Sequence, residues 1–138
     1  MIVYVDTSIV LRVLLGQPGG LGAWGQWKAA YSSELLGLEA RRVIDRLRLE
    51  LALDDQGVSE AQQTLLKIEH GIGYILLTQT VLYRASLPMP TALKTLDAIH
   101  LTSAMLFQEQ RKEKLVFATH DTTQATAARA LGFDVIGT

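Results

Sequence analysis

The chain contains no cysteine, and only 3 of its 138 residues are proline. The lack of cysteine excludes disulfide bonds, thiolate catalysis and zinc sites that use cysteine ligands. No stretch comes near the ~18 continuous apolar residues that a membrane-spanning helix requires. The sequence opens directly into a strand-like run, without the basic and apolar leader of an exported protein. We therefore expect a cytoplasmic protein with no membrane segment.

The chain also lacks an excess of charge of either sign, since 13 basic and 14 acidic residues leave a net charge of −1. Such a protein has no general positive field that could hold a polyanion, so any contact with nucleic acid must be local. Basic residues gather at Arg41, Arg42, Arg46 and Arg48, and taken alone these form a solvated helix face beside acidic neighbours. The apolar share of 49% predicts one folded domain over residues 1–138.

Strand-like and helix-like segments alternate along the chain. The uninterrupted apolar run at residues 2–5 is typical of a strand that is buried on both faces. Thr7 and Ser8 are then predicted to cap a helix that reaches about Leu14. Further short strands are expected at 31–32, 71–77, 115–118 and 135–136, and helices at 33–52, 58–69, 78–85, 95–111 and 122–131. This alternation predicts an α/β fold, a three-layer α/β/α sandwich with a central parallel sheet.

Acidic residues stand at comparable places on this scaffold. Asp6 and Asp121 directly follow predicted strands. Asp97 lies in the first turn of its helix, and Glu39 lies in the second turn of another. Because open α/β sheets bind ligands beyond the carboxyl ends of their strands, we expect these carboxylates to converge there. Oxygen ligands of this kind suit Mg²⁺ or Mn²⁺, which promote phosphodiester hydrolysis by acidifying a bound water and stabilising charge on the leaving oxygen.

Several short motifs recur in a fixed order around these acids. They are Val5-Asp6-Thr7-Ser8, then Ser32-Ser33-Glu34-Leu35 with Glu39 and Arg41-Arg42, then Leu96-Asp97-Ala98-Ile99-His100-Leu101 after Pro88-Met89-Pro90, and finally Ala118-Thr119-His120-Asp121 before an alanine-rich helix. With these motifs the whole chain resembles a PIN domain, of the compact type found in VapC-like toxin ribonucleases of type II toxin–antitoxin systems.

The resemblance implies a Mg²⁺- or Mn²⁺-dependent endoribonuclease that hydrolyses RNA with a metal-activated water. The catalytic and metal positions fall on Asp6, Glu39, Asp97 and Asp121. Asp6 and Asp97 are the expected direct ligands, Glu39 a ligand or a base that orients water, and Asp121 an outer ligand through water. Supporting or substrate-binding roles are expected for Thr7, Ser8, Thr119, Arg41, Arg42, Lys94 and His100. Many relatives carry one more acid a few positions after Asp121, where this chain has Gln124 and Ala125, and this departure bears on a second cation.

The resemblance also implies partners. They are an RNA substrate, a cognate antitoxin that keeps the toxin inactive, and a second copy of the chain in a homodimer. The apolar segment from Leu14 to Trp27 is the predicted docking site of a hydrophobic partner segment. Trp24 and Trp27 themselves either stack on bases or pack within a helix or an interface.

Simpler interpretations exist for some of these residues. Asp97 can act only on the helix N-terminus, and Asp121 can act only as the cap of the following helix. His100, one turn after Asp97, either orients a carboxylate, contacts RNA or is an ordinary packed histidine.

Two classes of phosphate-transfer protein are built on a similar sheet. A phosphatase of the haloacid dehalogenase type needs a second acid two residues after the first, but Ser8 stands there. A response-regulator receiver needs an acidic pair after the first strand, which this chain lacks. The remaining alternatives are a non-catalytic interaction module with a PIN fold and an RNA-processing nuclease outside a toxin system.

Overall fold

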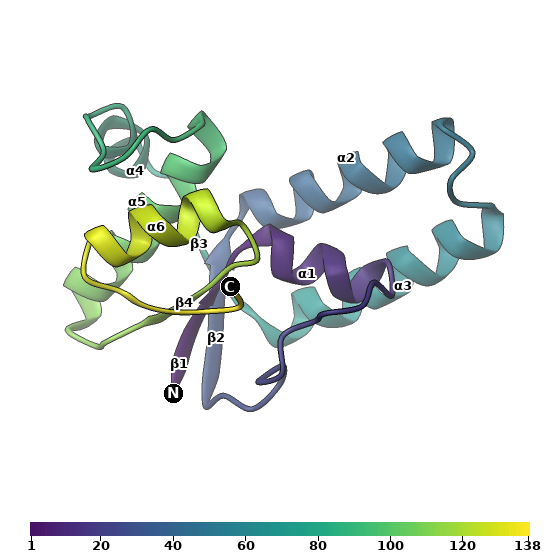
Figure 1. The fold of residues 1–138 in the computed structure, drawn as a ribbon, viewed down its shortest axis with the longest axis horizontal. Coiled ribbons are helices and arrows are strands. Elements are labelled where there is room, and N and C mark those ends of the chain that lie inside the picture. The colour runs from purple at the N-terminus through teal and green to yellow at the C-terminus, as the bar shows by residue number, and fades with distance from the viewer.

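A computed structural model describes all 138 residues and shows a five-stranded sheet with helices on both faces (Figure 1). The elements are β1 (Ile2–Val5), α1 (Thr7–Leu14), β2 (Ala29–Ser33), α2 (Leu35–Leu49), α3 (Asp55–Gly71), β3 (Gly73–Ile75), α4 (Gln79–Ala85), α5 (Thr95–Arg111), β4 (Val116–Ala118), α6 (Thr122–Ala130) and β5 (Asp134–Ile136). The strand order is β3-β2-β1-β4-β5, and every neighbouring pair is parallel. The predicted three-layer α/β/α sandwich is therefore confirmed.

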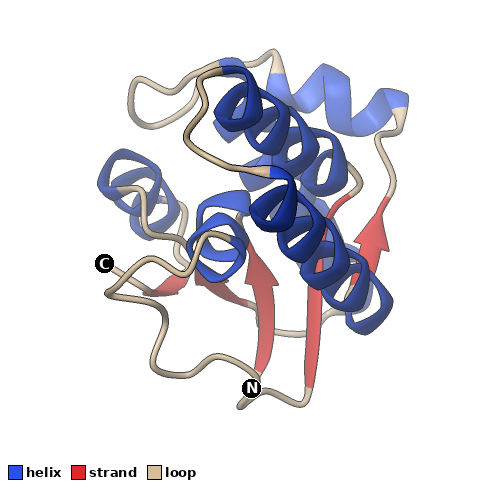
Figure 2. Ribbon diagram, turned by 90° about the vertical axis from the view of Figure 1, so that its right-hand side faces the viewer, coloured by secondary structure: helices blue, strands red, loops and turns tan.

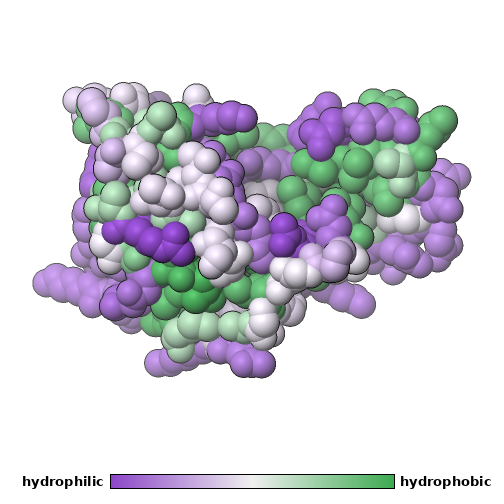
Figure 3. Space-filling model, viewed as in Figure 1, coloured by the Kyte–Doolittle hydropathy of each residue, from purple (hydrophilic) through white to green (hydrophobic).

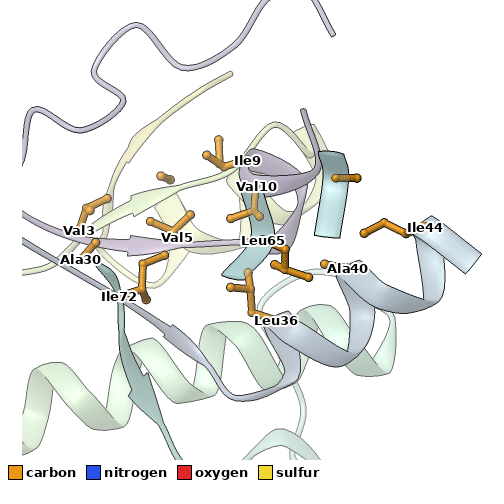
Figure 4. Packing of buried hydrophobic residues seen from close by; sticks show 12 residues of the cluster. Val3, Val5, Ile9, Val10, Ala30, Leu36, Ala40, Ile44, Leu65 and Ile72 are labelled. Carbon is orange, nitrogen blue, oxygen red and sulfur yellow. The ribbon is translucent and has the colours of Figure 1, made fainter. Parts of the chain in front are cut away.

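Side chains of the central strand alternate between the two faces of the sheet. Val3 and Val5 pack with residues of α1, α2 and α3 in one buried cluster (Figure 4). Tyr4 points to the opposite face, where it stacks on Phe117 of β4 with ring centroids 5.1 Å apart. Residues of α5 and α6 complete that second cluster. Helices therefore cover the sheet on both sides (Figure 2), which explains why β1 is an uninterrupted apolar run.

The helices α2 and α3 form a long pair that extends beyond the sheet (Figure 1). Arg41 of α2 and Glu69 of α3 join them through two hydrogen bonds, of 3.0 and 2.5 Å. A Cβ atom at Gly37 would lie 2.7 Å from both partners of this ion pair, so the glycine leaves the room that the pair occupies. Figure 3 shows hydrophobic surface at the far end of the helix pair, where Leu51 is 90% exposed. None of the helices is both long enough and apolar enough to cross a membrane.

Helix starts differ from the prediction at several places. Asp6, and not Thr7 or Ser8, caps α1, because its carboxylate accepts the Ser8 N–H at 3.3 Å. Likewise α3 begins earlier than expected, at Asp55, because Asp54 accepts the Gly57 N–H at 2.8 Å. A carboxylate caps a helix as well as a hydroxyl does, so the sequence alone offers both choices.

The glycine that weakens the predicted strand at 71–77 has a packing role. A Cβ atom at Gly73 would lie 2.6 Å from the ring of Tyr31 on the neighbouring strand. Only glycine lets β3 pair with β2 at this position without moving that ring.

Candidate functional site

The order of the strands reverses beside β1. From β1 the chain builds β2 and β3 on one side of the sheet, and it later places β4 and β5 on the other. In open α/β sheets, ligands bind at the carboxyl ends of the strands beside such a reversal. Asp6 follows β1 and Thr119 follows β4, and the Asp6 N–H donates to the Ala118 carbonyl at 2.9 Å. The first predicted acid therefore lies at the expected edge of the sheet.

The Asp6 side chain is buried, with 5% of its residue surface exposed. Its Oδ2 accepts hydrogen bonds from the Ser8 hydroxyl at 2.6 Å and from the Thr119 hydroxyl at 3.0 Å. Ser8 also accepts the His120 N–H at 3.0 Å, so it joins the ends of the two strands. The other oxygen, Oδ1, lies 3.8 Å from His100 Nε2. These contacts fix the plane of the carboxylate and leave Oδ1 less engaged than Oδ2.

Glu39 lies beside this carboxylate and has partners of its own. Its Oε1 lies 2.5 Å from Nε2 of His100 and accepts the Thr7 hydroxyl at 2.9 Å. The His100 ring is fully buried, and its Nδ1 lies 2.7 Å from the Tyr4 hydroxyl. Burial lowers the pKa of His100, but the hydrogen bond to Glu39 and the charge of Asp6 raise it above its usual value. His100 therefore orients a carboxylate, and its buried ring has no surface with which to contact RNA.

Asp97 and Asp121 face a pocket of about 380 Å³ that Lys94 and Thr123 also line. Burial, then the negative charges of Asp6 and Asp121, raise the pKa of Asp97 above its usual value. Asp121 instead caps α6, because its Oδ1 accepts the N–H groups of Thr123 at 2.8 Å and Gln124 at 3.1 Å. The charges of Asp6 and Asp121 therefore both act on Asp97, although burial is the larger cause of its raised pKa.

Comparison with known sequences agrees with this geometry. The sequence model of the PIN domain matches residues 3–130, from β1 to the end of α6. The chain belongs to the PIN domain family. Among curated proteins, Ribonuclease VapC47 of Mycobacterium tuberculosis (strain CDC 1551 / Oshkosh) is 30% identical to it, over 95% of this chain and 93% of that protein. The resemblance to PIN domains and to VapC-like ribonucleases is thus confirmed.

The acids of this PIN domain do not form a ready coordination sphere. No three Asp, Glu or His side chains gather closely enough to hold one ion together. Of the four predicted acids, Glu39 is held by His100 and Thr7, and Asp121 is held by the backbone of α6. Asp97 and Oδ1 of Asp6 remain as oxygen donors. They fit Mg²⁺ or Mn²⁺, since Mg²⁺ commonly uses only one or two carboxylates and completes its shell with water and phosphate oxygens.

The predicted phosphate-binding cations have different surroundings. Arg41 is engaged by Glu69, and the exposed Arg42 lies 3.4 Å from Asp45. Lys94 alone among the three lines the acidic pocket. Lys94 therefore lies at the candidate site of this PIN domain, whereas Arg41 links α2 to α3 through Glu69.

The tryptophans pack against the protein. Trp24 and Trp27 meet edge to face with centroids 5.2 Å apart and lie against the buried cluster under α1 and α3. With Val13 and Ile68 they line an apolar pocket of about 320 Å³. Of the two predicted roles, this arrangement favours packing or a protein interface over stacking on bases.

Two residues of this PIN domain with buried polar atoms near its acids do not stand out in the sequence. Tyr4 reads as one more apolar core position, yet its hydroxyl reaches His100. In the sequence Gln124 marks only a missing acid, yet its fully buried side chain faces Asp6. The signal that could have found Gln124 is a polar residue on the alanine-rich face of its helix.

Proposed function

We propose that this PIN domain is a metal-dependent endoribonuclease that acts as the toxin of a toxin–antitoxin pair. The observation that carries the proposal is that the charge of buried Asp6, at the switch point of the sheet, reaches Asp97, which lines a pocket with Asp121 and Lys94. Neither acid has a lysine or arginine partner, so the site favours a divalent cation. The likeness to a protein named as a ribonuclease supports RNA as the substrate.

Each side chain has a role in the proposed reaction. Asp6 and Asp97 would hold a Mg²⁺ or Mn²⁺ ion, while Ser8 and Thr119 fix Asp6. Such an ion would supply positive charge for the phosphate oxygens and would lower the pKa of a water.

Glu39 is the proposed proton acceptor. Its Oε1 is fixed by Thr7 and His100, which leaves Oε2 to take the proton of the water that attacks phosphorus. The new P–O bond forms as the P–O bond to the leaving ribose oxygen breaks, and that oxygen takes a proton from solvent. Lys94 contacts the phosphate from the rim of the pocket.

A cleavage assay tests the proposal. Purified protein is incubated with single-stranded and stem-loop RNA in Mg²⁺, in Mn²⁺ and in EDTA, and the same is done with Asp6→Asn and Asp97→Asn. We expect each substitution and EDTA to lower the rate by at least about 100-fold, since several kcal/mol of charge stabilisation are lost. Asp134→Asn, on the exposed end of β5, is the matched control and should cleave like the unaltered chain. Activity that survives EDTA or Asp6→Asn would overturn the metal mechanism.

The toxin role is tested in cells. Expression of the chain should arrest growth, and co-expression of the small protein encoded beside it should restore growth. We propose that this antitoxin docks on the apolar pocket of Trp24 and Trp27, and that the toxin itself forms a homodimer. Growth arrest without rescue by the neighbouring gene would favour an RNA-processing nuclease. A chain that neither cleaves RNA nor arrests growth would favour a non-catalytic interaction module.

A further inference from the structure

Gln124 is a fully buried polar residue that the proposed reaction does not use. It lies in the first turn of α6, where its N–H donates to Asp121 at 3.1 Å. Its side chain reaches back under the sheet edge to the carboxylate of Asp6 and the hydroxyl of Thr119. A buried amide is oriented by the donors and acceptors around it, so this placement has a physical reason.

The protons at Thr119 decide which end of the amide faces Asp6. The Thr119 hydroxyl carries one proton and lies 3.0 Å from Oδ2 of Asp6, and its oxygen accepts the Asp121 N–H at 3.0 Å. A carboxylate only accepts, so the hydroxyl proton goes to Asp6 and none remains for Gln124. The amide atom that faces both groups must therefore be the nitrogen.

With the nitrogen in that place, the amide makes strong contacts. Nε2 donates to Oδ2 of Asp6 at 3.0 Å and lies 3.2 Å from Oδ1 and from the Thr119 hydroxyl. The opposite orientation would set an amide oxygen against carboxylate oxygens and would gain only a 3.4 Å contact with the Asp97 carbonyl. Gln124 is thus the neutral donor that faces the Asp6 carboxylate from α6, opposite Ser8 on α1.

We propose that Gln124 is a positioning residue that holds Asp6 ready as a metal ligand. The inference rests on the metal site of the proposed function. An amide supplies a donor without a charge, so it steadies the carboxylate and leaves the negative charge for a cation. A lysine or arginine at this place would neutralise Asp6 and compete with the ion, whereas a glutamate would repel it. Groups that hydrogen-bond to metal ligands in this way commonly change metal affinity by about 10–100-fold when removed.

The test compares two buried substitutions on α6. Gln124→Met keeps the length of the side chain and removes the two N–H donors of the amide. Ala128→Gly weakens the same helix at a position that packs in the buried cluster around Tyr4 and Phe117. Mn²⁺ affinity is measured by titration calorimetry, and stability by thermal melting. We expect Gln124→Met to bind Mn²⁺ at least about 10-fold more weakly, and Ala128→Gly to melt earlier with unchanged affinity. Equal Mn²⁺ affinity in Gln124→Met and the unaltered chain would overturn the proposal, as would affinity losses that merely follow the losses of stability.

A measurement without metal separates this inference from the nuclease proposal. In ¹⁵N-labelled protein, the side-chain NH₂ group of Gln124 should exchange slowly with solvent, and Asp6→Ala should speed that exchange. Fast exchange in the unaltered chain would overturn the inference even if RNA is cleaved. Slow exchange together with the expected Mn²⁺ affinities would support it even if no RNA is cleaved, and the missing cleavage would then refute only the proposed function.

Discussion

His100 of α5 holds the carboxylate of Glu39 on α2, with 2.5 Å between Nε2 and Oε1. On the other side of the ring, Nδ1 lies 2.7 Å from the Tyr4 hydroxyl, which accepts the Ser33 N–H at 3.1 Å. The Tyr4 oxygen accepts from Ser33, and when the His100 ring is neutral the Tyr4 proton can point to Nδ1. In that form the proton of the ring sits on Nε2 and faces Glu39. A strand residue thereby sets the tautomer of a histidine that orients a candidate catalytic acid.

The Tyr4 hydroxyl can be removed without changing the shape of the core. Tyr4→Phe leaves the Ser33 N–H and His100 Nδ1 without their partner at a fully buried position. An unpaired buried polar group costs about 1–3 kcal/mol, so we expect urea unfolding to show a loss of that size. Tyr83→Phe, at a tyrosine that is 68% exposed on α4, should leave the unfolding free energy unchanged. A Tyr4→Phe protein as stable as the unaltered chain would contradict the hydrogen-bonded order described for these residues.

The ion pair between α2 and α3 predicts a dependence of stability on pH. The hydrogen bond from Arg41 lowers the pKa of Glu69 below its usual 4.5, against the smaller opposing effect of burial. A carboxyl group whose folded pKa is lowered adds stability above its unfolded pKa, and this stability is lost as the pH falls through the folded pKa. We expect Glu69→Gln to be less stable than the unaltered chain near neutral pH, with a difference that shrinks as the pH falls below the usual carboxyl value.

Urea unfolding between about pH 6 and pH 3 measures that difference. Glu113→Gln, at an exposed residue beyond the end of α5, removes one carboxylate without touching the ion pair. The free energy of unfolding of Glu113→Gln should change with pH in the same way as that of the unaltered chain. A constant difference between Glu69→Gln and the unaltered chain at all pH values would show that Glu69 acts through packing and not through its charge.

The ends of the strands and the alternation of strands with helices can be predicted from the sequence, because each follows from local chemistry. A parallel strand buried on both faces must be apolar throughout, so β1 was found at Ile2–Val5. The acids that follow strands were placed at one sheet edge by the same reasoning, and Asp6 lies there. The sequence alone does not decide between Asp6 and Thr7 or Ser8 as the helix cap, since all three residue types are favoured at that position.

The contacts among the site residues could not be predicted, because they join residues that are far apart in sequence. Glu39 and His100 are 61 positions apart, and no local pattern marks them as partners. Tyr4 lies within an apolar strand, so the sequence predicts a core position and gives no sign that its hydroxyl contacts His100. Gln124 is a neutral residue in an alanine-rich helix, and its role appears only when the protons of Thr119 are counted.

The ends of α2 and α6 have the same hydrogen-bonded turn but different residues at its left-handed position. In α2, Ala52 N–H donates to the Leu47 carbonyl and Leu51 N–H to the Arg48 carbonyl, with Leu51 at φ 59°. The turn at α6 places Gly132 at φ 91° in the equivalent position. A non-glycine residue in this conformation costs roughly 1–2 kcal/mol.

Leu51→Gly should therefore stabilise the protein by about 0.5–1 kcal/mol, since Leu51 is 90% exposed and gives up little packing. Gly132→Ala, the reverse change in the matching turn, should destabilise it by about 1 kcal/mol. Urea unfolding of both variants checks that Leu51→Gly raises the free energy of unfolding and that Gly132→Ala lowers it. A loss of stability in Leu51→Gly would mean that the exposed leucine is covered by another molecule under the conditions of the measurement.

Thermal melting with and without metal tests the acidic site. Asp6 and Asp97 repel each other without a cation, so Mn²⁺ should stabilise the unaltered chain by about 2.7 kcal/mol at a concentration 100 times its dissociation constant. Gln124→Glu replaces the amide that faces Asp6 with a second carboxylate at hydrogen-bonding distance. Because like charges at this distance strongly disfavour each other, the variant should melt several degrees lower in EDTA and gain more from Mn²⁺ than the unaltered chain does.

Thr126→Glu is the matched control for that change. It adds the same charge to an exposed position of α6, where the hydroxyl bonds only the Thr122 carbonyl at 2.9 Å. Its melting temperature in EDTA and its gain from Mn²⁺ should both stay close to those of the unaltered chain, because the added charge lies in water and away from Asp6. If Gln124→Glu and Thr126→Glu respond alike to Mn²⁺, then the ion does not bind beside Asp6. If Mn²⁺ leaves the melting of the unaltered chain unchanged, the paired carboxylates of Asp6 and Asp97 do not hold a cation.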